Sequence, residues 1–505
     1  MPARRLPSMI SPRSWVFLEE VGHLDELGWD GPQREKLWRY NQHYFDDLNA
    51  IGATDRILWH TALVRDWVTH NPPGKGNGWE PYPLSLRVVN WVKWTLGGAD
   101  LSEAAMQSLA VQLRWLNSRL ENHLLGNHLF ANAKALVMAG LFFEGSEADT
   151  WLAKGLRILA SEVPEQLLSD GGHFERSTMY HALALEDMLD LMNATQCFAH
   201  RLSPAQRKQV ADWPQRGSMM HAWLLTMSHP DGKISLFNDA AFDIAPSVAE
   251  LDGYARRVLV GVPPKVPSPL VQLRESGYLR LALGPAVVLL DAAPIGPDYL
   301  PGHAHADTLS FELSVGAQRV LVNSGTSCYG SSPERLRQRG TAAHNTVVVN
   351  GQDSSEVWCG FRVARRAYPL ELNIQQSADA SATEVYCAHN GYARLKGKPI
   401  HHRIWRFDAQ GLSVIDRVDG PHQSAEARFH FHPAVQVQID PNQAEGSATL
   451  PDGTVISWHL DHGHARLDAG TWHPRFGHVE SNQCMVVQLL DGRSTMHFRW
   501  ASAKA

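Results

Sequence analysis

The segment Gly302-His-Ala-His-Ala-Asp-Thr-Leu-Ser-Phe-Glu-Leu-Ser-Val-Gly316 decides the fold class of the C-terminal half of the chain. Apolar and polar residues alternate through Leu309–Val315 and a glycine follows, which is typical of a half-buried β-strand that ends in a turn. Just before it, His303, His305 and Asp307 occupy every second position, so an extended chain points them to one side. The segment predicts a strand with converging acid–base or metal-ligating groups at one end. Histidines that are merely hydrogen-bonded at a sheet edge are the alternative.

Outward from this segment, the two halves of the chain differ in periodicity. Short apolar runs punctuated by Gly, Pro, Asn and Asp follow it, and no helical stretch separates them, which favours antiparallel packing over a parallel sheet. These runs are 286–290, 346–349, 412–415, 427–431 and 485–489. From about residue 30 to 260, apolar residues instead recur at helical spacing. The proline-rich segment 261–269 breaks any helix, so we expect a helical domain over 1–262 and an antiparallel β domain over 270–505.

The composition excludes several classes of protein. The chain has 505 residues, of which 44% are hydrophobic and 19% charged, as in soluble globular proteins. Forty-six Lys and Arg against 52 Asp and Glu give a formal charge of −6, which argues against a nucleic-acid partner. Five widely spaced cysteines without a C-x-x-C pair indicate neither a disulfide framework nor a cysteine zinc site.

The lengths of the apolar runs indicate whether the chain carries a signal peptide or a membrane span. The run Trp15–Leu18 after Arg4 and Arg5 is shorter than the roughly 7 to 15 residues of a signal-peptide core. The longest apolar stretch, Ala135–Phe143, is well below the roughly 18 residues that indicate a membrane span. We therefore expect no membrane span and a cytoplasmic protein, or a periplasmic or secreted one if a native leader is missing.

Three further clusters carry chemistry-bearing residues. Gly126–Asn132, at the start of an expected helix, contains Asn127 and His128, although an asparagine there can also be only an N-cap. Asp170–His181 leads through a glycine turn into a helix that Ser177 can cap. In that helix, Tyr180 shares an apolar stripe and can alternatively be a core tyrosine. Ala343–Thr346 places His344 before another apolar strand.

Together and in this order, the clusters resemble the heparinase II/III-like polysaccharide lyases, including their alginate-lyase relatives. The resemblance covers most of the chain, from 37–41 and 82–91 through 229–232 and 237–239 to the two histidine motifs. It implies an N-terminal incomplete (α/α) toroid followed by a C-terminal antiparallel β-sandwich, with the substrate cleft between them.

The resemblance also implies an activity, β-elimination at a uronic acid in an acidic polysaccharide. The C5 proton is hard to remove until the neighbouring carboxylate is neutralised. By resemblance, Asn127 binds that carboxylate with help from His128 and His303. Tyr180 is the Brønsted acid that protonates the departing O4 oxygen, and whether it is also the base stays open. Arg176 and the histidines are the candidate neighbours that assist it.

Substrate binding is expected to involve Arg87, Asn90 and Trp91, because an anionic sugar needs a guanidinium for its carboxylate and an aromatic face for its ring. Glu175 and Arg176 complete the expected binding set.

Many relatives hold a structural zinc, and the matching residues here are His305, Asn323 and His344. The segment reads Leu321-Val-Asn-Ser-Gly325, with an amide where the family usually has a carboxylate. A neutral amide oxygen brings no charge to the metal, so we expect low or substoichiometric zinc and no organic cofactor. Asp307 is an alternative ligand, or a hydrogen-bond partner of a ligating imidazole.

Two other functions remain open. A glycoside hydrolase on a similar toroid needs two carboxylates that flank the bond, and the available acids are Glu175, Glu186, Asp187 and Asp239. A non-catalytic glycan-binding protein of polysaccharide biosynthesis can keep the same scaffold.

Overall fold

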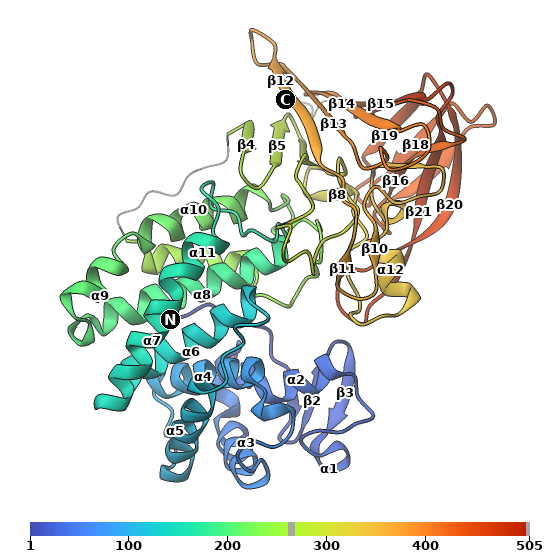
Figure 1. Ribbon diagram of the computed structural model, residues 1–505. Coiled ribbons are helices and arrows are strands. Elements are labelled where there is room, and N and C mark those ends of the chain that lie inside the picture. Colours follow the sequence, from blue (N-terminus) through green and yellow to red (C-terminus); the bar gives the residue numbers. More distant parts are fainter. Residues whose placement is uncertain (261–267, 501–505) are drawn as a thin grey trace. The chain divides into compact units, whose positions relative to one another are not determined.

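The computed structural model describes residues 1–260 and 268–500, which form two compact units (Figure 1). Unit 1 holds Met1–Leu167, Ala182–His221 and the described residues from Ala245 to 260. Unit 2 holds Leu168–His181, Ala222–Ile244 and the described residues from 268 onward. The units therefore differ from the contiguous domains 1–262 and 270–505, because two segments of the helical half group with the sheets. Most of the proline-rich segment expected as the boundary lies outside the described residues.

Unit 1 is built mainly from helices, as the periodicity predicts. A small antiparallel sheet of β1 (Met9–Ser11), β2 (Ser14–Phe17) and β3 (Glu20–His23) comes first, followed by the short α1 (Leu24–Leu27). The later helices are α2 (Lys36–Tyr44), α3 (Ile57–His70), α4 (Pro81–Leu96), α5 (Glu103–Asn117), α6 (Gly126–Phe142), α7 (Ser146–Gln166), α9 (Pro204–Gln209) and α11 (Val248–Val258). The unit boundary falls within α8 (Thr178–Cys197) and α10 (Trp213–Thr226).

Buried ion pairs join the helices of unit 1. Lys93 on α4 and Lys134 on α6 both donate to the Asp190 carboxylate on α8, over 3.0 and 2.7 Å. The two lysines hold the pKa of Asp190 below its ordinary value, although burial alone would raise it. Within the described residues, no helix combines the length and the hydropathy that a membrane span requires.

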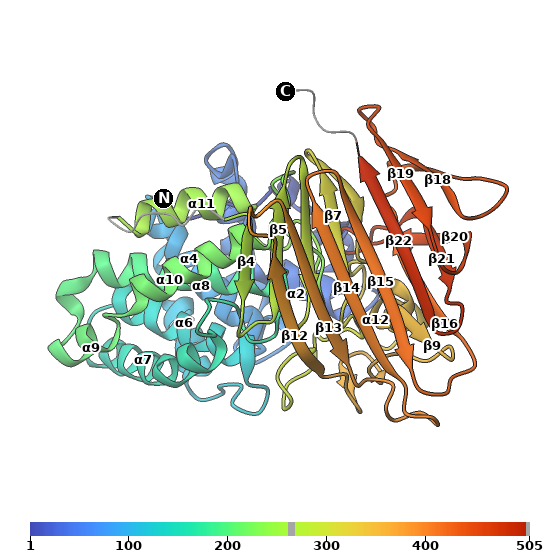
Figure 2. The same cartoon turned by 90° about the horizontal axis from the view of Figure 1, so that it is seen from above.

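Unit 2 contains three larger antiparallel sheets (Figure 2) and the two-stranded antiparallel pair of β10 (Val357–Trp358) and β11 (Arg362–Val363). A five-stranded sheet has the order β4-β5-β6-β7-β8, an eight-stranded sheet β12-β13-β14-β15-β22-β19-β18-β17, and a four-stranded sheet β20-β21-β16-β9. Their strands are β4 (Leu270–Leu273), β5 (Tyr278–Leu283), β6 (Ala286–Asp291), β7 (Phe311–Val315), β8 (Gln318–Leu321), β9 (Val347–Val349), β12 (Pro369–Gln376), β13 (Ala382–His389), β14 (Ile400–Asp408), β15 (Gly411–Asp419), β16 (Ala425–His430), β17 (Gln436–Ile439), β18 (Glu445–Thr449), β19 (Val455–Leu460), β20 (His464–Trp472), β21 (Glu480–Gln488) and β22 (Arg493–Trp500). One apolar cluster, which includes Phe311, Trp405 and Phe429, joins the three sheets. The expected antiparallel arrangement is confirmed.

Strand β7, which the alternation of Leu309–Val315 predicts to be half-buried, is buried on both faces. Its polar residues face a buried histidine, because Glu312 and Ser314 bind the two ring nitrogens of His229 over 2.7 Å each. The expectation of a solvent-facing polar side was therefore wrong. These bonds also explain why Ala222–Ile244 groups with the sheets.

Candidate active site

Asp239 is the centre of a cluster of side chains in unit 2. Its carboxylate is fully buried and accepts hydrogen bonds from Arg335, from His303 Nδ1 over 2.9 Å and from His305 Nε2 over 2.8 Å. Burial alone would raise the pKa of Asp239, but the Arg335 guanidinium and the two imidazoles hold it well below its ordinary value. Asp239 is therefore a fixed anion that orients both histidines.

The bond to Asp239 also sets the state of the His303 ring. A carboxylate at Nδ1 places a proton on that nitrogen, so Nε2 is the nitrogen that remains for other chemistry. The His303 side chain is 14% exposed, whereas that of His305 is fully buried. Of the two, only His303 reaches the surface, where it can contact a substrate.

Tyr180 lies directly against His303. Their ring centroids are 3.9 Å apart, and the Tyr180 hydroxyl lies 2.8 Å from the hydroxyl of Tyr329. Tyr180 belongs to the first turn of α8, where Ser177 Oγ accepts from the Tyr180 backbone N–H and donates to the carbonyl of Asp239. The expected Ser177 cap is confirmed. The neighbours of Tyr180 are thus proton-carrying side chains as well as core residues.

Tyr329 and Arg335 are functional candidates that the sequence analysis missed. Burial, followed by the nearby Asp239 charge, raises the pKa of Tyr329 well above its ordinary value, so this phenol stays protonated. The Arg335 guanidinium lies 5.1 Å from the centroid of the Tyr329 ring. Tyr329 is in a loop and Arg335 in the short α12 (Pro333–Arg339), so neither belongs to a periodic pattern that points to a site.

In unit 1, Asn127 and His128 lie in the first turn of α6. Leu125 occupies the N-cap position without a side-chain bond, so the alternative that Asn127 is the cap is wrong. His128 Nδ1 lies 3.1 Å from Glu121 Oε1, and the ring contacts Tyr82 at 4.4 Å between centroids. Both residues are partly exposed at the helix end where the partial positive charge favours an anion.

Arg87, Asn90 and Trp91 do not line a binding surface, so this expectation is corrected. Arg87 is fully buried and donates to Gln112 Oε1 and to backbone carbonyls, while its guanidinium stacks 3.9 Å from the Trp67 ring centroid. Trp91 is also fully buried, and Asn90 is bonded to the Tyr44 carbonyl. All of these contacts lie inside unit 1, so the arginine and the aromatics serve helix packing.

Glu175 and Arg176, also expected to bind substrate, both make contacts within unit 2. The Arg176 guanidinium donates to the backbone carbonyls of Glu275 and Ser276. Glu175 is buried, with one carboxylate oxygen 3.8 Å from His173 Nδ1. The burial of Glu175 argues against contact with a polysaccharide, whereas Arg176 is partly exposed and its substrate-binding role stays a prediction.

The three residues expected to hold zinc do lie together in unit 2. His344 Nδ1 is 3.3 Å from Asn323 Oδ1, and the His305 and His344 rings are 5.2 Å apart between centroids. Among the described residues, His305 Nδ1 and His344 Nε2 have no hydrogen-bond partner. Burial lowers the pKa of both rings, that of His305 to about 4, so both are neutral at pH 7.

This donor set suits a metal only in part. It offers two neutral imidazole nitrogens, but the Asn323 oxygen brings no charge and is bonded to His344. Within the described part of the chain, no group of three or more His, Cys, Asp or Glu side chains is arranged to hold a metal ion. The low zinc content stays a prediction.

The four acidic residues that a glycoside hydrolase could use all contact other side chains. Glu186 pairs with Arg5, Asp187 with Lys134, and Asp239 with Arg335. Glu175 is buried beside His173, and only Asp187 is partly exposed, so the four do not supply two open acids that flank a bond. The hydrolase alternative therefore loses its structural basis.

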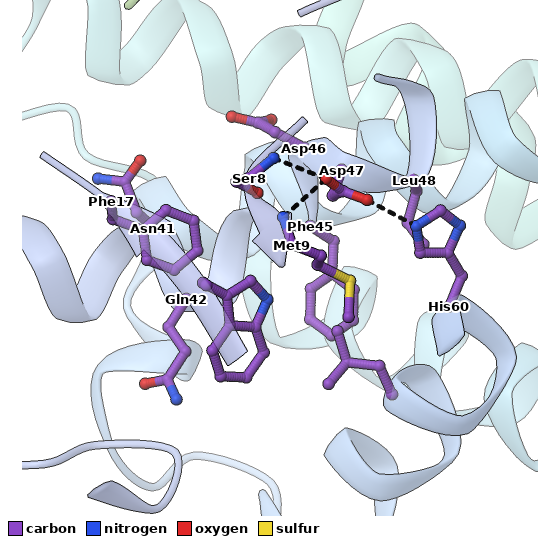
Figure 3. Close-up of a pocket in the computed structure, with 12 residues that line it drawn as sticks. Ser8, Met9, Phe17, Asn41, Gln42, Phe45, Asp46, Asp47, Leu48 and His60 are labelled. Carbon is purple, nitrogen blue, oxygen red and sulfur yellow. Dashed lines mark hydrogen bonds and ion pairs between the residues drawn. The ribbon is translucent and has the colours of Figure 1, made fainter. Parts of the chain in front are cut away.

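A small cavity in unit 1 is no substrate site either. It measures about 10 Å³, enough for at most one water molecule. Figure 3 shows the Asp47 carboxylate beside it, accepting from the backbone of Ser8 and Met9 and facing His60. These contacts anchor the N-terminal segment.

Comparison with known proteins agrees with the architecture. Residues 57–255 match the family model described as heparinase II/III N-terminus, and residues 265–501 match the model heparinase II/III-like, C-terminal. Among solved structures, heparinase III has a TM-score of 0.70 at 17% identity, over 93% of this chain and 77% of that chain. A heparan sulfate lyase from Pedobacter heparinus has a TM-score of 0.64 at 18% identity, over 94% and 79%. At these identities the likeness concerns the fold, and it confirms the expected incomplete toroid followed by a β-sandwich.

The matches to curated relatives differ in how much of each protein they cover. The heparin-sulfate lyase of Pedobacter heparinus is 25% identical over 340 residues, 63% of this chain and 48% of that protein. This chain thus spans about half the length of that relative. The FtsZ-localized protein C of Caulobacter vibrioides is 24% identical over 476 residues, 84% of this chain and 77% of that protein.

Proposed function

Because this chain belongs to the heparinase II/III-like family, we propose that it is a polysaccharide lyase that cleaves a uronic-acid-containing glycan by β-elimination. The observation that carries the proposal is the contact of Tyr180 with both His303 and Tyr329, with His303 locked by Asp239. A phenol beside an oriented imidazole suits proton transfer at a sugar ring.

The reaction needs two proton movements and one bond cleavage. A base removes the proton from C5, the C4–O4 bond breaks, a C4–C5 double bond forms, and the departing O4 takes up a proton. We assign the last proton to the Tyr180 hydroxyl. If Tyr180 also acts as the base, its phenolate accepts the C5 proton first and the same hydroxyl returns a proton to O4.

Tyr329 can assist Tyr180 whether Tyr180 acts as the acid alone or as both the acid and the base. Because the Tyr329 phenol stays protonated, it can donate its hydrogen bond to the Tyr180 oxygen whenever Tyr180 has lost its proton. Hydrogen bonding to the charged form of a group favours that form. Tyr329 thereby lowers the cost of the phenolate.

The substrate carboxylate must be neutralised before C5 can lose its proton. Asp239 occupies Nδ1 of the His303 ring, so Nε2 is the ring nitrogen left to contact the carboxylate. Asn127 and His128 are assigned the same task on the basis of the family resemblance, and their place at the N-terminus of α6 supports it.

A glycan-binding protein without catalysis is the second candidate. The observation that favours it is the match to FtsZ-localized protein C, whose name states a location rather than a reaction and which covers 84% of this chain.

One experiment separates these functions. The chain is incubated with alginate, heparan sulfate, chondroitin sulfate and hyaluronan, and the ultraviolet absorbance of an unsaturated uronate is followed. A lyase generates this chromophore, and Tyr180→Phe serves as the control. New reducing ends without the chromophore indicate hydrolysis, and binding without either product indicates a glycan-binding protein.

A further inference from the structure

The hairpin of β10 (Val357–Trp358) and β11 (Arg362–Val363) exposes two aromatic side chains. Trp358 is 54% exposed, and Phe361 in the connecting turn is 42% exposed. Single exposed apolar residues are ordinary on protein surfaces. Two on one short hairpin beside α12 (Figure 1) are a feature that the proton-transfer chemistry does not explain.

Phe361 contacts the groups proposed to transfer protons. Its ring centroid lies 5.9 Å from that of His303 and 5.2 Å from that of Tyr329, in edge-on arrangements. The Arg335 guanidinium lies 5.5 Å from the same ring. A sugar that places its C5 proton and O4 oxygen at this cluster therefore lies beside Phe361.

Two buried arginines hold the turn of the hairpin in place. Arg335 Nε donates to the Gly360 carbonyl, and Arg339 donates to the carbonyls of Cys359 and Gly360. Arg335 also binds Asp239, so one guanidinium joins the active-site anion to the hairpin. The aromatic side chains are thus presented on a fixed backbone, which reduces the ordering cost of binding.

The hairpin also pairs an aromatic ring with a cation. Trp358 and Arg362 are directly opposite in the register, so their side chains lie on the same face of the hairpin. Both are exposed. An indole face packs against the C–H groups of a sugar ring, and a guanidinium binds a carboxylate or sulfate in bidentate fashion.

We propose that the β10–β11 hairpin is a binding subsite for the acidic sugar residues that flank the cleaved bond, with Phe361 as the platform nearest the reaction and the Trp358–Arg362 pair beyond it. This inference rests on the proposed function, because the bound polymer is taken to be the lyase substrate. It assigns polymer recognition to residues that carry out no proton transfer.

Affinity electrophoresis of the full chain in gels that contain alginate, heparan sulfate or hyaluronan measures the Kd for each polymer. We expect Trp358→Ala and Phe361→Ala each to raise the Kd for the bound polymer about tenfold or more, as for a buried aromatic anchor. Arg362→Gln is expected to weaken binding mainly at low salt, where charge attraction is least screened. The control is Val479→Ala, which removes an apolar side chain that is also 54% exposed and leaves the hairpin intact.

The outcomes separate this inference from the lyase proposal. An unchanged Kd in both aromatic variants at wild-type Tm, or a wild-type chain that binds none of the polymers, overturns the subsite. If the wild type generates the chromophore and binds independently of the hairpin, the lyase proposal stands and the subsite falls. If binding depends on the hairpin but no polymer yields the chromophore, the lyase proposal falls and the hairpin remains a glycan-binding surface.

Discussion

The hydroxyl oxygen of Tyr329 lies 2.8 Å from the hydroxyl oxygen of Tyr180, so the two phenols share one hydrogen bond. Substituting Tyr329→Phe removes that bond and keeps the ring between Phe361 and Phe476. We expect kcat to fall by about tenfold or more, with KM nearly unchanged, because the lost partner supports the Tyr180 phenolate. The pH–rate profile of the variant should shift to higher pH. A drop in Tm at unchanged kcat and an unshifted profile would mean that Tyr329 has only a structural role.

The Asp239–Arg335 ion pair allows stability and catalysis to be separated. Arg335→Met leaves a carboxylate buried without its guanidinium, and breaking a buried pair in this way costs about 3 to 5 kcal/mol of unfolding free energy. The double variant Asp239→Asn/Arg335→Met removes both charges, so we expect it to regain most of that stability in a denaturant titration. It should not regain turnover, because His303 has lost its anionic partner. Recovery of activity together with stability would contradict the assignment of Asp239.

The zinc expectation is tested by restoring the missing charge. In Asn323→Asp, a carboxylate joins the neutral imidazoles of His305 and His344, so zinc retention after dialysis should rise. Elemental analysis of both proteins provides the measurement. One tightly held zinc ion per wild-type chain would show that the absent charge has been given too much weight.

Burial and the neighbouring Arg87 lower the pKa of His43 to about 3. The unfolded chain binds a proton at this residue below about pH 6.5, whereas the folded chain does not until about pH 3. Stability from His43 is therefore complete above pH 6.5 and is lost as the pH falls from 6.5 towards 3. The slope is about 1.4 kcal/mol per pH unit.

His43→Gln should flatten this part of the stability profile, since an amide oxygen can still accept the Trp67 indole N–H and does not titrate. Urea titrations between pH 6.5 and 4.5 measure the difference, with the exposed His70→Gln as the matched control. Equal slopes for wild type and His43→Gln would refute the prediction.

The sequence alone predicted the helical half and the strands of the second half, because periodicity of 3.6 and of two residues is a local property. It could not predict that the polar face of β7 is buried, since the partner His229 comes more than 80 residues earlier in the chain. Tyr329 and Arg335 could not be identified from the sequence for the same reason, because their importance depends on contacts with Tyr180 and Asp239.

For Arg87 and Trp91, the sequence predicted a binding surface, whereas the structure buries both side chains. An arginine close to tryptophans is the chemistry of an acidic-sugar site, but it is equally the chemistry of a buried guanidinium stacked on an indole. Residue type and helical spacing are the same in both cases. Only the burial of the side chain distinguishes them.

The turnover of Tyr180→Phe on a polymer that the wild type cleaves tests the central claim most directly. The substitution removes one hydroxyl and keeps the ring against His303. The account predicts a loss of about 100-fold or more in the rate of chromophore formation, because general acid–base catalysis contributes at least that much. It also predicts a Kd for the polymer close to that of the wild type and a fold that stays intact by circular dichroism. Wild-type turnover in Tyr180→Phe would contradict the account and remove Tyr180 from the mechanism.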